Sequence, residues 1–185
     1  MLTNKKVSDY FDLLILSIED LWNKRSSKKE PFSHVWIIRS NSKTEKVPND
    51  LIDIMLSSNE AKEEFSFIMK DYVKDQNPQG IVFCIEAWVA KDINEDLLPR
   101  SYHNAKDKAA AMAECVHDAG GAKAFGSLYG RTIEVLFLTA EDDEGGASCV
   151  TFEIQKDGSL LRNTEFEDKY TKASGRFCNF FNPEN

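Results

Sequence analysis

The chain has 185 residues, of which 42% are hydrophobic and 29% are charged, a balance that excludes a wholly disordered protein and fits one domain. Its 31 acidic and 23 basic side chains give a net charge of −8, which disfavours nucleic acid and anionic membrane surfaces as partners. No apolar run approaches the roughly 18 residues of a membrane span, and no signal-peptide pattern opens the chain. We therefore expect one cytoplasmic domain over residues 1–185, with its four cysteines as reduced thiols.

Two long amphipathic helices are predicted in the first half of the chain. In the first helix, over residues 7–25, apolar residues recur at spacings of three and four. Its stripe consists of Val7, Phe11, Leu14, Ile18 and Leu21. The second helix begins at a capping box, from Ser57 to Glu60, and ends before Asn77-Pro78. Its expected buried stripe is Ala61, Phe65, Ile68, Met69 and Tyr72.

Strand patterns alternate with these helices. Residues 32–40 are rich in β-branched and aromatic side chains and predict a strand, with a return strand ending near Val47. Three stronger strands follow at residues 80–91, 131–143 and 147–158, and the acidic EDDEGG turn joins the last two as an antiparallel hairpin. The sequence therefore predicts an α+β fold in which a three-strand antiparallel meander and an N-terminal hairpin carry helices packed on one face.

The connection between the first two strong strands is about 40 residues long, too long for a structureless loop. We expect a helical, glycine-rich insert at about 92–130, with an alanine-rich helix over 105–118 and a mobile glycine-rich connection over 120–130. A C-terminal tail at about 163–185 is expected to dock through Phe177, Phe180 and Phe181.

Alternation along the three strong strands divides their residues between two faces. One set is uniformly apolar: Ile81, Phe83, Ile85, Ala87, Val89, Ile133, Val135, Phe137, Val150, Phe152 and Ile154. We expect a core cluster there that joins Phe83, Ile85, Val135, Phe137, Phe152 and Ile154 to Phe65 and Ile68 of the second helix. The other set is mixed: Cys84, Glu86, Trp88, Glu134, Leu136, Leu138, Thr151, Glu153 and Gln155.

The mixed set admits three interpretations. It can be an amphipathic surface partly covered by residues 105–118 or by the C-terminal aromatic residues. It can be an interaction face, with Trp88 as an aromatic anchor and the glutamates setting specificity. It can also hold a catalytic pair of carboxylates, if two of the acids share a cleft. The candidate binding residues are Glu86, Trp88, Glu134, Leu136, Leu138 and Glu153.

The other chemical motifs in the sequence give little support for a catalytic or ligand-binding site. GAKAFGS has the outer spacing of a phosphate-binding loop, but Ser127 stands where its lysine belongs. His103, Cys115 and His117 lack the spacing of a zinc site, so no metal and no cofactor is predicted. Cys84, in the middle of a strand, is expected to be a buried apolar residue and not a nucleophile.

The segments Glu86-Ala87-Trp88 and Arg131–Phe137, with the acidic hairpin behind them, resemble uncharacterised small proteins of bacteria and their phages over residues 80–160. The resemblance implies a bacterial or phage origin and no activity. From the residues, the leading hypothesis is a non-catalytic binding or assembly protein that uses the mixed face for a protein partner or self-association, including a homodimer. The alternative is a small hydrolase or transferase that uses carboxylates among Glu86, Glu134 and Glu153.

Overall fold

The computed structural model describes residues 1–25, 32–41, 43–56, 58–164 and 180–181. Within them, six strands form one antiparallel sheet in the order β2-β1-β3-β4-β5-β6. The elements are α1 (Lys5–Asn23), β1 (Ser33–Ile38), β2 (Thr44–Lys46), α2 (Asn49–Leu56), α3 (Asn59–Gln76), β3 (Gly80–Lys91), η1 (Glu95–Leu97), α4 (Arg100–Asn104), α5 (Lys108–Asp118), α6 (Ala122–Tyr129), β4 (Arg131–Asp142), β5 (Ala147–Ile154) and β6 (Leu160–Asn163). The α+β class and the antiparallel sheet expected from the sequence are confirmed.

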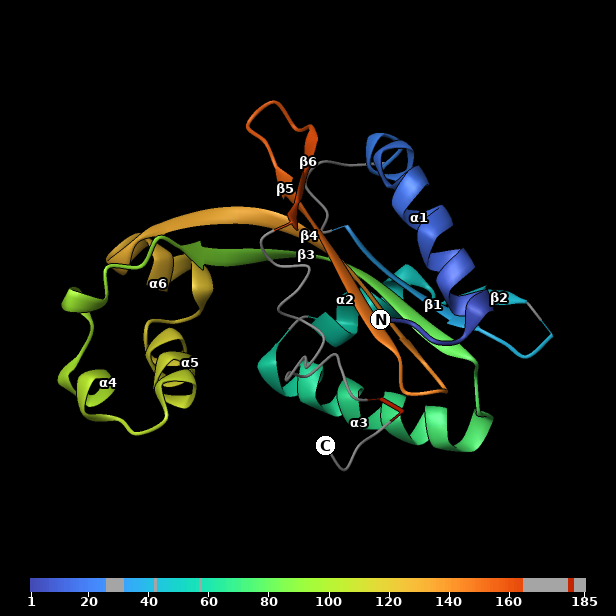
Figure 1. Cartoon of the computed structure of the whole chain (residues 1–185), viewed down its shortest axis with the longest axis horizontal. Helices are drawn as coiled ribbons and strands as arrows, with labels where there is room; N and C mark the ends of the chain where they lie inside the picture. The colour runs from blue at the N-terminus through green and yellow to red at the C-terminus, as the bar shows by residue number, and fades with distance from the viewer. Residues whose placement is uncertain (26–31, 42, 57, 165–179, 182–185) are drawn as a thin grey trace.

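Helix α1 covers one face of the sheet, here called the α1 face (Figure 1). The helix begins at Asn4, whose side chain accepts the N–H of Lys6 and caps the first turn. Its buried residues are Val7, Phe11, Leu14, Ile18 and Trp22, so the predicted stripe is confirmed except that Trp22 replaces the half-buried Leu21. They form the largest core cluster with β-strand residues that include Val82, Cys84, Leu136, Leu138, Val150 and Phe152.

Helices α2 and α3 cover the opposite face, here called the α3 face (Figure 1). The prediction that the helices pack on one face was therefore wrong, because α1 and α3 enclose the sheet from both sides. Helix α3 buries Phe65, Met69 and Val73, whereas Ile68 is 57% exposed, so Ile68 does not belong to the core. Ser57 lies outside the described residues; Ser58 caps α3 instead, accepting the N–H of Ala61 at 3.1 Å.

The face assignment of β5 was also wrong. Leu138 pairs with Val150 and Leu136 pairs with Phe152, so Val150 and Phe152 lie on the α1 face and not with Phe137. The residue opposite Phe137 is Thr151, which is fully buried. Alternation could not fix the phase of this strand, because both faces of the sheet are covered and residues of both parities are buried.

The insert between β3 and β4 forms a small helical lobe at the far end of a long two-stranded arm (Figure 1). Its own apolar cluster contains Leu98, Tyr102, Ala111, Cys115 and Phe125. The connection expected to be mobile at 120–130 is largely helix α6. Gly126 lets α6 approach the strands closely, because a Cβ there would lie 2.8 Å from the carbonyl oxygen of Arg131.

The β4–β5 turn holds the start of α1. The Asp142 side chain is fully buried, and its Oδ2 accepts the N–H groups of Thr3 and Asn4 at 2.7 and 2.9 Å. Its Oδ1 accepts the N–H groups of Glu144 and Gly146 at 3.1 and 2.6 Å. Burial alone would raise the pKa of Asp142, but these donated hydrogen bonds outweigh it and the pKa lies below its usual value.

Candidate functional site

Part of the predicted binding surface is core. Leu136 and Leu138 have no exposed surface and pack beneath α1 in the largest core cluster. The prediction that they contact a partner was wrong, because the stripe of α1 covers them. Neither the 105–118 segment nor Phe180 does so, since α5 belongs to the helical lobe and Phe180 to the α3 face.

Glu153 is separated from the other predicted acids. It pairs with Val135 and Leu161, which places it on the α3 face. The prediction that Glu153 shares a face with Glu86 and Glu134 was therefore wrong. The reason is the one given above for β5, whose residues alternation assigned to the wrong faces of the sheet.

Glu86, Trp88 and Glu134 do share the α1 face, beyond the part that α1 covers. Glu134 pairs directly with Trp88, and Glu86 is the diagonal neighbour of Glu134 across the β3–β4 ladder. The Glu86 Oε2 accepts the N–H of Phe32, just before β1, at 3.0 Å. The ladder and this hydrogen bond hold the two glutamates side by side.

The Glu86 carboxylate lies close enough to Glu134 to accept a hydrogen bond from its protonated form. Burial raises the pKa of Glu134, and the hydrogen bond and the charge of Glu86 raise it further, while nearby Lys123 opposes the shift. Glu134 therefore keeps its proton to a higher pH than an isolated glutamate does.

Trp88 stands next to this pair and is 39% exposed. The Nζ of Lys123, from α6, lies 4.1 Å from the centroid of the indole ring, within the range of a cation–π contact. Sequence reasoning missed Lys123, because the segment around it was interpreted as a loop. The Lys123 ammonium group therefore already lies over part of the Trp88 ring.

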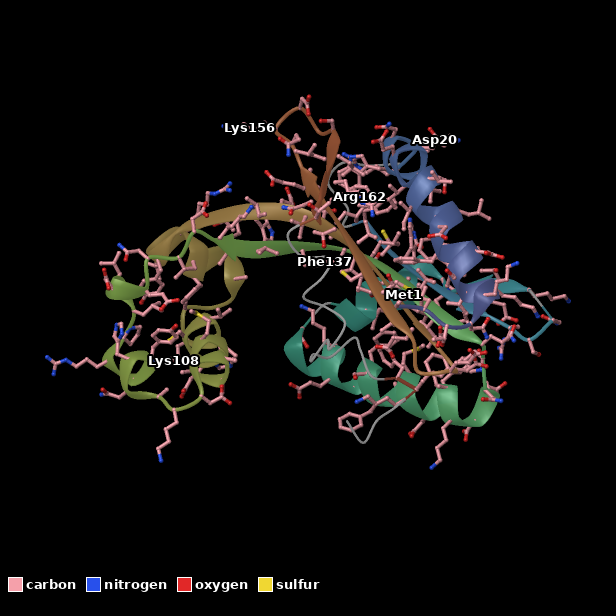
Figure 2. The ribbon with its side chains drawn as sticks, in the orientation of Figure 1. Met1, Asp20, Lys108, Phe137, Lys156 and Arg162 are labelled. Carbon is pink, nitrogen blue, oxygen red and sulfur yellow. The ribbon has the colours of Figure 1, made fainter. Side chains whose placement is uncertain are left out.

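A groove of about 220 Å³ opens over the carboxyl pair. Its other walls come from the end of α1 and from the β5–β6 turn: Trp22, Arg25, Ile154, Gln155, Lys156, Asp157 and Gly158. Figure 2 shows Lys156, in that turn, and Asp20, in the last turns of α1, along the upper edge of the molecule. The groove therefore joins four segments that are distant in the sequence.

The walls of the groove are held by specific contacts. The indole N–H of Trp22 donates to the carbonyl oxygen of Gly158 at 2.7 Å and ties α1 to the β5–β6 turn. The guanidinium of Arg25 lies 3.6 Å above the Trp22 ring and donates to the carbonyl oxygen of the same residue. Gln155 contributes a buried amide nitrogen with no hydrogen-bond partner within the described residues. The contacts of Trp22 and Arg25 fix this wall of the groove within the protein itself.

The chemistry open to this site is narrow. Two neighbouring carboxyl groups can pass a proton between them or bind one cation. Burial raises the pKa of the Cys84 thiol far above its usual range, so Cys84 is no nucleophile. No group of three His, Cys, Asp or Glu side chains in the described ranges is placed to hold a metal ion.

Comparison with known proteins adds no relative: no family model, no curated protein and no solved structure matches this chain. Among the helices of the described residues, none combines the length and the apolar character that a membrane span requires.

Proposed function

We propose that this protein is a non-catalytic binding protein that receives a basic side chain of a protein partner in the groove over Glu86 and Glu134. The single observation that carries the proposal is that two neighbouring carboxyl groups, Glu86 and Glu134, line one groove. A guanidinium group can donate two hydrogen bonds to paired carboxyls and can take the place of the proton on Glu134. Trp88 offers an exposed aromatic surface beside that position.

The surroundings favour an arginine on a peptide segment over a free cation. Arg25 and Lys156 line the same groove, so its charge is mixed and a bare cation gains little there. A peptide segment brings carbonyl oxygens for these donors together with the basic side chain. Because arginine replaces a proton, affinity should rise as the pH passes upward through the pKa of Glu134, which burial and the Glu86 hydrogen bond hold above its usual value.

The test uses two pools of nonapeptides, one with a fixed central arginine and one with citrulline, which keeps the shape and removes the charge. Binding is followed through the indole N–H resonances of Trp88 and Trp22. We expect shifts with the arginine pool alone. Glu134→Gln should weaken binding at least about tenfold, and Trp88→Ala about thirtyfold with the fold retained.

The matched control is Glu153→Gln, which changes the same residue type on the α3 face and should leave binding unaltered. Equal binding of both pools, or equal losses in Glu153→Gln and Glu134→Gln, contradicts the proposal. Sedimentation tests a different partner. If the wild type is a dimer and Trp88→Ala is a monomer, the surface binds a second copy of the chain instead.

A second candidate function rests on the same pair, since two neighbouring carboxyl groups can act on a water molecule as general acid and general base. The protein would then be a small hydrolase. Turnover of fluorogenic ester or amide substrates that vanishes in both Glu86→Gln and Glu134→Gln, with a bell-shaped pH profile, would favour catalysis over binding. Turnover that survives either change excludes it.

A further inference from the structure

An aromatic socket lies on the α3 face, on the other side of the sheet from the groove. Its walls are Phe65 of α3 and Phe83 of β3, whose rings meet edge to face with centroids 6.4 Å apart. The surrounding cluster is completed by Val35, Ile52, Met69, Val73 and Ile81. The socket is occupied by Phe180, which is 2% exposed and stacks on Phe83 with centroids 5.1 Å apart and an interplanar angle of 21°.

The backbone of the occupant is recognised as well as its ring. The N–H of Phe180 donates to Oε2 of Glu141 at 2.8 Å. Glu141 pairs with Ile81 and so stands on the same face, next to the socket. Phe181 adds a half-buried contact with the same cluster. The socket therefore recognises a short peptide feature, namely an aromatic side chain together with its own backbone N–H.

The walls of the socket belong to the sheet and to α3, whereas its occupant comes from the last residues of the chain. Phe65, Phe83 and Glu141 stand on elements paired or packed with their neighbours independently of residue 180. Phe180 joins this cluster through its buried ring, and its backbone N–H donates the hydrogen bond to Glu141. A peptide of the same chemistry can make every one of these contacts.

We infer that the aromatic socket is a peptide-binding site for a partner protein that presents an exposed aromatic residue, and that Phe180 occupies it in cis. A tethered occupant competes at an effective concentration in the millimolar range, so it masks the site from weak ligands. A partner gains access by outcompeting Phe180. This inference is independent of the proposed groove function, because the two sites lie on opposite faces of the sheet.

The test uses the full chain with Phe180→Ala and a labelled peptide, Asn-Phe-Phe-Asn-Pro-Glu, which copies residues 179–184. Fluorescence anisotropy should show weak binding to the wild type and at least about tenfold tighter binding to Phe180→Ala, because the cis competitor is gone. A peptide with alanine in place of the first phenylalanine should bind neither protein. In the Phe180→Ala background, Glu141→Ala should weaken binding of the original peptide.

Phe67→Ala is the matched control, since Phe67 also lies on α3 but is 71% exposed, and this change should leave peptide affinity as in the wild type. Thermal unfolding of Phe180→Ala, with and without peptide, should show a folded protein that the peptide stabilises. If Phe180→Ala does not fold, Phe180→Leu keeps an apolar occupant without ring stacking, and it should bind the peptide more tightly than the wild type. If the wild type and a folded Phe180 variant bind the peptide with equal affinity, the inference is overturned. It is also overturned if the wild type is a dimer and the Phe180 variant is a monomer.

Discussion

Replacing Asp142 with asparagine tests how strongly the β4–β5 turn holds the N-terminal helix. In the wild type each carboxylate oxygen accepts two backbone N–H groups, from Thr3 and Asn4 on one oxygen and from Glu144 and Gly146 on the other. Asparagine has one oxygen, so in either orientation its NH₂ group faces two donors. Two hydrogen bonds to a charged acceptor, at about 1.5 to 3 kcal/mol each, predict a loss of about 3 to 6 kcal/mol.

The loss should depend on pH with a defined sign. Burial opposes ionisation of Asp142, but the donated hydrogen bonds prevail and its folded-state pKa is lowered. A lowered pKa stabilises the fold above the unfolded-state pKa of about 3.9, and this stabilisation is lost as pH falls through the folded-state value. The difference between wild type and Asp142→Asn should therefore be complete at neutral pH and shrink in strong acid.

Urea unfolding followed by circular dichroism measures both quantities. Asp157→Asn is the matched control, because Asp157 accepts hydrogen bonds from Ser159 in the β5–β6 turn but is exposed to solvent. Its unfolding midpoint should stay near that of the wild type. A difference between wild type and Asp142→Asn that is absent at neutral pH, or that stays constant into acid, would refute the account of the buried carboxylate.

Three further predictions concern packing and charge. Leu136→Ala should cost about 3 to 5 kcal/mol in urea unfolding because its side chain is fully buried, whereas Leu161→Ala, 58% exposed, should change stability by less than about 0.5 kcal/mol; similar values would contradict the assigned faces. Gly80→Ala should cost about 1 to 3 kcal/mol in thermal unfolding, because its Cβ would lie 2.5 and 2.7 Å from the methyl groups of Val7, and shortening that residue to alanine should recover part of the loss. The pKa of Glu134 is raised by burial and by its carboxyl partner, so its contribution to stability is present at low pH and lost as pH rises through that pKa; Glu134→Gln should flatten the profile of stability against pH in that range, and an unchanged profile would argue against the raised pKa.

The helices and strands were predictable where one face of an element meets solvent. In α1 the opposite face of the helix is exposed to solvent, so only the buried face needs apolar residues. Val7, Phe11, Leu14 and Ile18 therefore recur with helical spacing, and the sequence pattern matches the buried residues. In β5 this contrast is lost. Val150 and Thr151 are adjacent and both buried, one against each layer of helices, so alternation gives no phase.

The candidate site was predictable only in part. Glu86, Trp88 and Glu134 belong to neighbouring strands, so alternation within each strand and one antiparallel register were enough to bring them together. The groove was not predictable, because Trp22 and Gly158 meet through a contact between segments far apart in the chain. Lys123 was missed because glycines on both sides of it suggested a loop.

The helical lobe has a consequence for how quickly the central sheet can form. The β3–β4 ladder closes at the pair Lys91 and Arg131, so even the nearest partners of the longest strand pair are separated in sequence by the whole lobe. Non-local pairing slows folding, because the entropy of closing the intervening chain is lost before the pairing is gained. Helices form faster than such ladders, and α6 packs against both strands near the closing pair. A lobe that folds first would bring Lys91 and Arg131 together and turn a slow long-range search into the zipping of a hairpin.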